Sequence, residues 1–221
     1  VGTQVVSFKE HGPPDALTEA SLARHRPVPD RVARLAALAG AWVRLRQTPA
    51  GERRVAIVLA NYPSRDGRLA NGVGLDVPAS CIGLLRALAG AGYGLRDLPA
   101  DGAELMARLA AGPTNELAGR SEREIRVRLP MADYRELFAG LPAAVRERVL
   151  ARWGEPESDP HVADGAFALA VLPLGNVVIG LQPARGYHID PDATYHAPDL
   201  DPPHGYLAFH LWLRHRFDAH A

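Results

Sequence analysis

Apolar residues recur along this chain with helical spacing in several places. Between residues 30 and 47, for example, Val32, Leu35, Leu38 and Trp42 fall on one stripe, as expected for one face of an α-helix. Asp30 precedes that stripe and suits the N-cap position. On the same grounds we expect helices over 30–47, 78–90, 103–111 (capped by Asp101), 132–139, 143–153 and from His204 onward.

Other apolar segments are shorter and lack that period. Val55 to Ala60 is a continuous apolar run between turn residues, typical of a strand buried on both faces of a parallel-type sheet. Residues 167–172 and 177–181, joined by a Pro-Leu-Gly-Asn turn, predict a strand hairpin before the last helix. Weak alternation predicts a further strand over 123–129. Helices interleaved with such strands indicate an α/β fold.

Two long irregular stretches separate these elements. Residues 61–77, rich in Gly, Arg and Asp, lie between the buried parallel-type strand and the helix at 78–90, and residues 182–203 precede the final helix. Loops of this length are usually functional or disordered. We therefore divide the chain into a helical lead-in (1–52), a β-loop-α unit (53–112), a mostly helical segment (113–165) and a segment of strand hairpin, irregular loop and final helix (166–221).

Composition excludes several classes of protein. Lys plus Arg total 25, as do Asp plus Glu, so the formal net charge is zero, unlike that of a dedicated nucleic-acid binder. A single cysteine excludes a disulfide framework and Cys-rich zinc modules. No apolar run approaches the roughly 20 residues that a bilayer span requires. We expect a cytoplasmic protein.

The sequence contains only incomplete versions of two nucleotide-binding motifs. Gly67 and Gly72 have the spacing of a P-loop, but Val73 stands where the lysine belongs. Gly72 and Gly74 begin a GxGxxG pattern, but Val77 occupies its third glycine position. The chain is therefore not expected to bind ATP or a dinucleotide through either motif.

The second irregular stretch concentrates possible metal ligands. Imidazole and carboxylate groups together suit a divalent first-row metal such as cobalt, nickel or zinc. His204 opens a helix, whose positive dipole end favours a neutral imidazole that can ligate a metal or accept a proton. The histidines are His188, His196 and His204, and Asp190, Asp192, Asp199 and Asp201 lie among them. For each histidine, a surface position or structural hydrogen bonding is the alternative.

Several longer sequence motifs resemble those of a known protein family. VAIVLANYP at 55–63, followed by RDGR at 65–68 and NGVGLD at 71–76, resembles the large-subunit family of tetrapyrrole metal chelatases. GLQPARGY at 180–187 and PPHGYLA at 202–208 resemble it as well. Within that family the sequence is most similar to the cobaltochelatase branch. Magnesium chelatase large subunits share the 55–63 motif but match the loop after Pro63 less well.

The resemblance implies an activity and partners. It implies that the chain is an internal slice of a much longer subunit, which inserts Co²⁺ into hydrogenobyrinic acid a,c-diamide during aerobic cobalamin biosynthesis. Co²⁺ is then a substrate, and ATP is hydrolysed by a separate AAA+ ATPase subunit that acts with a subunit carrying an adhesion-type domain. We expect the slice alone to be inactive, with the catalytic base downstream of Ala221.

The resemblance also suggests roles for residues. Substrate binding is expected from residues that can recognise ring carboxylates and amides or lie against the macrocycle: Arg65, Arg68, Gln182, Arg185 and Tyr187. Metal approach is expected at His188, His196 and His204, with His204 also the candidate for proton transfer. Because a helix-opening histidine carries little core, His204→Ala is expected to leave folding nearly intact.

Two alternatives stay open. One is a magnesium-chelatase-like large subunit for another metal. The other is a non-catalytic scaffold segment that docks the ATPase subunits through the 61–77 loop.

Overall fold

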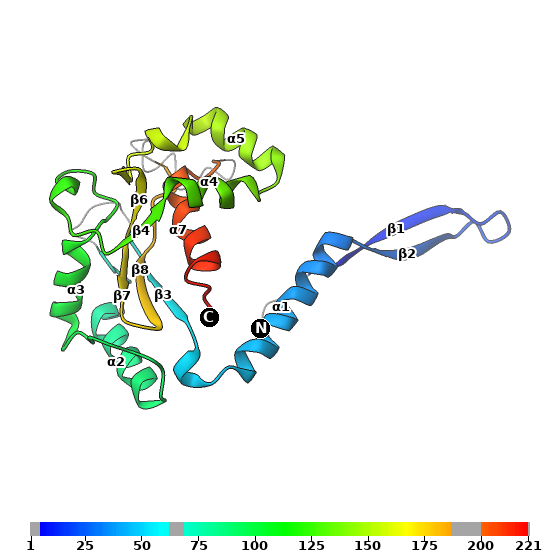
Figure 1. Cartoon of the computed structure of the whole chain (residues 1–221). Helices are drawn as coiled ribbons and strands as arrows, with labels where there is room; N and C mark the ends of the chain where they lie inside the picture. The colour runs from blue at the N-terminus through cyan, green and yellow to red at the C-terminus, as the bar shows by residue number, and fades with distance from the viewer. Residues whose placement is uncertain (1–4, 62–68, 187–199, 221) are drawn as a thin grey trace. The chain divides into compact units, whose positions relative to one another are not determined.

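The computed structural model describes residues 5–61, 69–186 and 200–220 (Figure 1). Contacts between residues divide the chain into two compact units, Val1–Pro49 and Ala50–Ala221. The second unit contains helices on both sides of a small sheet, so the predicted α/β class is confirmed.

The first unit consists of a strand hairpin and one helix. Strands β1 (Ser7–Pro14) and β2 (Ser21–Pro27) pair antiparallel, and helix α1 spans Pro29–Gln47. The predicted helix is confirmed, but its predicted cap is wrong: Val28 is the N-cap and Asp30 lies in the first turn, because Pro29 already begins the helix. No described residue of this unit is buried, and Trp42 is 61% exposed.

The second unit is built on a three-stranded sheet. After the short 3₁₀ helix η1 (Ala50–Glu52), strand β3 (Val55–Leu59) pairs in parallel with β8 (Val177–Leu181). Strand β7 (Val171–Pro173) pairs antiparallel with β8, which confirms the last part of the predicted hairpin and gives the order β3–β8–β7. The expected burial of β3 on both faces is wrong. It is an edge strand of the described sheet, whereas all five residues of β8 are buried.

Alternation along β8 places it between two apolar cores. Val177, Ile179 and Leu181 pack with helices α2 (Val77–Gly90) and α3 (Gly102–Ala111). Val178, on the opposite face, packs with helix α7 (His204–His215), as the period of two along a strand requires. Figure 1 shows α2 and α3 on one side of this sheet and α7 on the other.

The predicted strand over 167–172 is divided between two sheets. Strand β6 (Ala166–Leu169) pairs with β4 (Val127–Pro130) and β5 (Val162–Ala163), and only β7 joins β8. The two strands, separated by Ala170, take different partners. The predicted strand over 123–129 begins later, at Val127.

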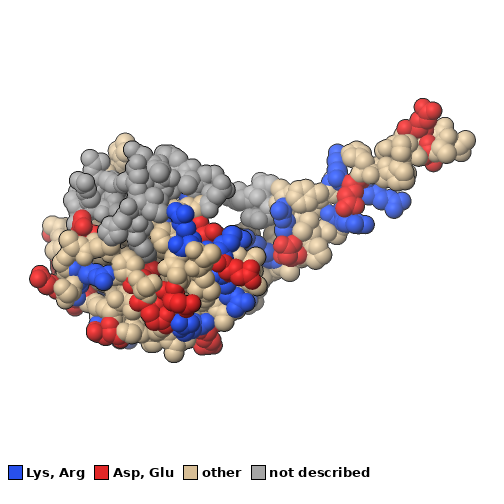
Figure 2. Space-filling model, turned by 90° about the horizontal axis from the view of Figure 1, so that it is seen from above, with Lys and Arg blue, Asp and Glu red and all other residues tan. Residues whose placement is uncertain are grey.

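The two helices predicted between residues 132 and 153 are confirmed. Helices α4 (Met131–Ala139) and α5 (Ala143–Trp153) lie within a residue of the expected bounds. Short 3₁₀ helices η3 (Arg120–Glu122) and η4 (Pro156–Ser158) flank them. None of the described helices is long and apolar enough to cross a membrane. On the face in Figure 2, acidic and basic side chains are interspersed over the larger unit.

Candidate functional site

The parallel strands of the second unit end beside each other. Leu59 pairs with Leu181, and the Gln182 N–H donates to the Leu59 carbonyl at 2.8 Å, which extends the pairing by one residue. Asn61 and Gln182 therefore emerge at the same edge of the sheet. In α/β proteins, ligands bind beyond the carboxyl ends of parallel strands, so this carboxyl edge is the candidate site.

Asn115 joins the two strands just beyond their last pair. Its Nδ2 donates to the carbonyl oxygens of Asn61 (3.3 Å) and Gln182 (3.0 Å), and its Oδ1 accepts from the Ala184 N–H at 3.0 Å. The sequence analysis missed this residue. It lies in a polar connection without hydrophobic period, and no motif around it distinguishes it from the other polar residues there.

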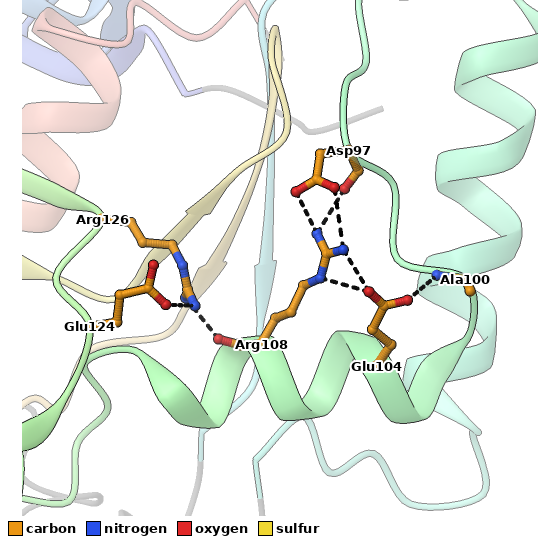
Figure 3. A network of polar contacts seen from close by, with 6 residues as sticks. All are labelled: Asp97, Ala100, Glu104, Arg108, Glu124 and Arg126. Atoms are coloured by element: carbon orange, nitrogen blue, oxygen red, sulfur yellow. Dashed lines mark hydrogen bonds and ion pairs between the residues drawn. The ribbon is translucent and has the colours of Figure 1, made fainter.

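The connection that carries Asn115 is itself held in place. Arg123 Nη1 donates to the Gly112 carbonyl (3.2 Å) and to Thr114 Oγ1 (3.0 Å). Arg126 Nη1 donates to the Arg108 carbonyl at 2.8 Å, and the Arg108 guanidinium in turn contacts Asp97 and Glu104 (Figure 3). The backbone on either side of Asn115 is therefore fixed to helix α3.

Asn61 presents an unused amide at this edge. The residue is 2% exposed, and neither Nδ2 nor Oδ1 of its side chain has a hydrogen-bond partner within the described part of the chain. Buried polar groups are nearly always paired in native proteins. The edge therefore holds one donor group and one acceptor that the chain's own described residues leave unsatisfied.

Two predicted substrate-binding residues follow β8 directly. Gln182 is half-buried and Arg185 is exposed, and neither side chain has a hydrogen-bond or ion-pair partner among the described residues. The structure therefore brings an amide and a guanidinium together on the segment that Asn115 holds. Five other predicted residues, Arg65, Arg68, Tyr187, His188 and His196, lie outside the described residues.

His204 belongs to the core. The residue is 1% exposed, its Nδ1 lies 2.7 Å from the Tyr134 hydroxyl, and its Nε2 lies 3.0 Å from the Gly154 carbonyl. A carbonyl only accepts, so Nε2 carries a proton and donates to Gly154, while Nδ1 shares the other hydrogen bond with the Tyr134 hydroxyl. Burial raises the pKa of Tyr134, which keeps its phenol protonated.

Both ring nitrogens of His204 are thus occupied, and the ring offers no lone pair to a metal in this structure. The expectation that this histidine carries little core is wrong, because Tyr134 and Phe138 pack around it. The first turn of helix α7 is held by a residue far away in the chain, because Asp159 Oδ2 accepts from the Gly205 N–H at 2.9 Å.

The residues before α7 are also bound to the helical segment. Trp153 Nε1 donates to the Asp201 carbonyl at 2.9 Å, and Arg148 Nε donates to the Asp201 carboxylate at 3.0 Å. Asp201 is therefore an ion-pair partner of an arginine. Among the described residues, no three His, Cys, Asp or Glu side chains are grouped so that they would hold a metal ion.

A cavity of about 430 Å³ lies beside the connection that carries Asn115. It is lined by nine residues between 113 and 128, by residues 160–164 and by Ala168, and Arg120, Arg123 and His161 are among them. None of the predicted site residues lines it. The cavity nevertheless adjoins the carboxyl edge, because Thr114 and Glu116, the neighbours of Asn115, line it.

Comparison with known proteins decides the family. The family model described as CobN/Magnesium Chelatase matches residues 1–221. The chain belongs to this family. It is 51% identical over 218 residues to the aerobic cobaltochelatase subunit CobN of a Sinorhizobium species, and 47% identical over 219 residues to that of Pseudomonas aeruginosa.

A solved structure agrees with this CobN/magnesium chelatase assignment. The catalytic subunit of cobaltochelatase from Mycobacterium tuberculosis is 37% identical, with a TM-score of 0.76 over 99% of this chain. The chain spans 17% and 18% of the length of the two curated relatives and 18% of the solved chain. The predicted family is therefore confirmed, and the resemblance extends over both units.

Proposed function

We propose that this chain forms part of the tetrapyrrole-binding region of an ATP-dependent cobaltochelatase large subunit. That enzyme inserts Co²⁺ into hydrogenobyrinic acid a,c-diamide in aerobic cobalamin biosynthesis. The observation that carries the proposal is 51% identity to a cobaltochelatase subunit across 99% of this chain. Insertion of another metal, as in magnesium chelatases, is the alternative that the shared family model supports.

Partners complete the proposed reaction. ATP is hydrolysed by an AAA+ ATPase subunit, which acts with a subunit carrying an adhesion-type domain, and the assembly works in the cytoplasm. Neither Walker-type nor dinucleotide motif occurs in this chain, which agrees with a nucleotide site on another subunit. The chain by itself binds the tetrapyrrole and does not complete metal insertion.

The carboxyl edge supplies the groups that the tetrapyrrole requires. Metal insertion needs a held ring, a base for the two pyrrolic protons and a metal ion that sheds its water. In this proposal Arg185 binds a ring carboxylate, as a guanidinium does well in bidentate fashion, and Gln182 binds an amide or acid side chain. Arg65, Arg68 and Tyr187 add contacts to the ring, and His188 and His196 lie on the metal's approach.

His204 takes a different role in this proposal. With both ring nitrogens bonded, it holds the start of α7 rather than the metal or the transferred proton. The base for the pyrrolic protons is then supplied by another part of the enzyme.

Titration of the chain with a cobyrinate-type tetrapyrrole, followed by absorbance and fluorescence, tests the proposal. We expect saturable binding and a Kd raised roughly ten- to a hundredfold by Arg185→Ala, since a hydrogen bond to a charged group contributes about 1.5–3 kcal/mol. Arg135→Ala is the matched control, because Arg135 pairs with Glu155 and Glu157 on the surface of α4. A chain that binds no tetrapyrrole contradicts the proposal and favours a scaffold role.

A further inference from the structure

We infer that Asn115 is a positioning residue for tetrapyrrole binding: its amide fixes the Gln182–Ala184 backbone and so aims Gln182 and Arg185 at the substrate. This inference rests on the function proposed above. Asn115 lies outside the motifs that carry the family resemblance. Three separate features of the edge support the inference.

The first feature is the chemistry of the contact. Asn115 uses both sides of one planar amide, with Nδ2 donating to two carbonyl oxygens and Oδ1 accepting from a backbone N–H. An amide supplies donor and acceptor together, whereas a carboxylate only accepts. Asparagine is thus matched to this backbone in a way that aspartate of the same shape is not.

The second feature is the end of the sheet. Pairing between β3 and β8 stops at the bond from the Gln182 N–H to the Leu59 carbonyl. The next N–H on the side of β3 belongs to Ala184, two residues on, because the Leu181 N–H and the position of Pro183 both face β7. Asn115 bonds the backbone on both sides of this proline, at the Gln182 carbonyl and the Ala184 N–H. It therefore takes over the support that the sheet cannot give.

The third feature is the change in burial from Ala184 to Arg185. Ala184 is 8% exposed, while Arg185, the next residue, is exposed and has no partner among the described residues. A buried, hydrogen-bonded anchor thus directly precedes an available guanidinium. Bidentate carboxylate recognition depends on the placement of the planar guanidinium.

The substitution Asn115→Asp tests the inference, because it keeps the shape and replaces Nδ2 by an oxygen that faces two carbonyls. We expect the Kd of the 221-residue chain for a cobyrinate-type tetrapyrrole to rise about tenfold or more. Asn176→Asp is the matched control. The Asn176 Nδ2 donates to the Gly51 carbonyl at 2.7 Å, at the opposite end of β8. The Kd of the Asn176→Asp chain should therefore stay unchanged, even if its melting temperature falls as much as that of the Asn115→Asp chain.

A mutant cycle separates positioning from general destabilisation. Because Asn115 is inferred to aim both Gln182 and Arg185, Asn115→Asp should change the Kd by less than about threefold once both of these residues are alanine. The same full effect in both backgrounds overturns the inference. Asn115→Ala, measured the same way, replaces the aspartate variant if that one does not fold.

Failure of this inference differs from failure of the proposed function. Tetrapyrrole binding that is unchanged by Asn115→Asp overturns the positioning role alone. Absence of binding by the unsubstituted chain overturns the proposed function, and this inference with it.

Discussion

A histidine at the start of a helix is compatible with two roles, and His204 shows what decides between them. Its position in the sequence suits a metal ligand, because the helix dipole favours a neutral ring. Its partners Tyr134 and Gly154 lie 70 and 50 residues away in the chain and place it in the core instead. Burial of this residue depends on tertiary contacts that local spacing does not reveal.

The hydrogen bond between Tyr134 and His204 leads to a prediction about the stability of the fold. Tyr134→Phe removes the hydrogen-bond partner of His204 Nδ1 and leaves that buried nitrogen unpaired, so the free energy of unfolding should fall by about 1–3 kcal/mol. His204→Ala also leaves a cavity and should cost more, about 2–5 kcal/mol. Urea denaturation followed by fluorescence measures both.

Tyr206→Phe is the control for this prediction. It deletes the same hydroxyl group from a tyrosine on α7 whose hydroxyl has no hydrogen-bond partner among the described residues. Its effect should stay within about 0.5 kcal/mol. Equal losses for the two tyrosine variants would show that the Tyr134–His204 bond does not stabilise the fold.

Helices marked by local features, such as an apolar stripe, could be predicted from the sequence. The pairing of strands, which depends on residues far apart in the chain, could not. Helix α3 matches expectation because Asp101 caps it with its own side chain. Strands β3 and β8 are both apolar runs, and composition does not show which of them is central. Strands β1 and β2 were missed because their exposed, proline-containing sequences lack alternation.

Close packing between β8 and α7 gives a prediction at the element scale. A Cβ on Gly180 would lie 2.6 Å from Cζ of Phe209, a ring in the core. Gly180→Ala should therefore lower the free energy of unfolding by about 1–3 kcal/mol. Gly83→Ala is the control, since a Cβ there meets nothing within 4 Å. Inside α2 it should stabilise by up to about 1 kcal/mol.

Thermal or urea unfolding of the two glycine variants checks this pair. A Gly180→Ala chain as stable as the unsubstituted one would mean that α7 packs on β8 less closely than the structure has it.

At the scale of the whole molecule, the candidate site is only partly predictable. The rule for parallel strands places it at the carboxyl edge, and Gln182 and Arg185 follow from the family resemblance. Asn115 contacts residues 54 to 69 positions away in the chain, and Asp159 caps a helix that begins 45 residues later. Single polar residues in loops carry no period, so these long-range contacts leave no signal in the sequence.

The central claim is that the tetrapyrrole binds at the carboxyl edge of β3 and β8. Amide hydrogen exchange, with and without a saturating cobyrinate-type tetrapyrrole, tests it most directly because it reports protection along the chain. We predict slower exchange at residues 59–61 and 181–186, apart from Pro183, and at Asn115. Protection confined to residues 116–125 and 161–164, around the cavity of about 430 Å³, would contradict the claim.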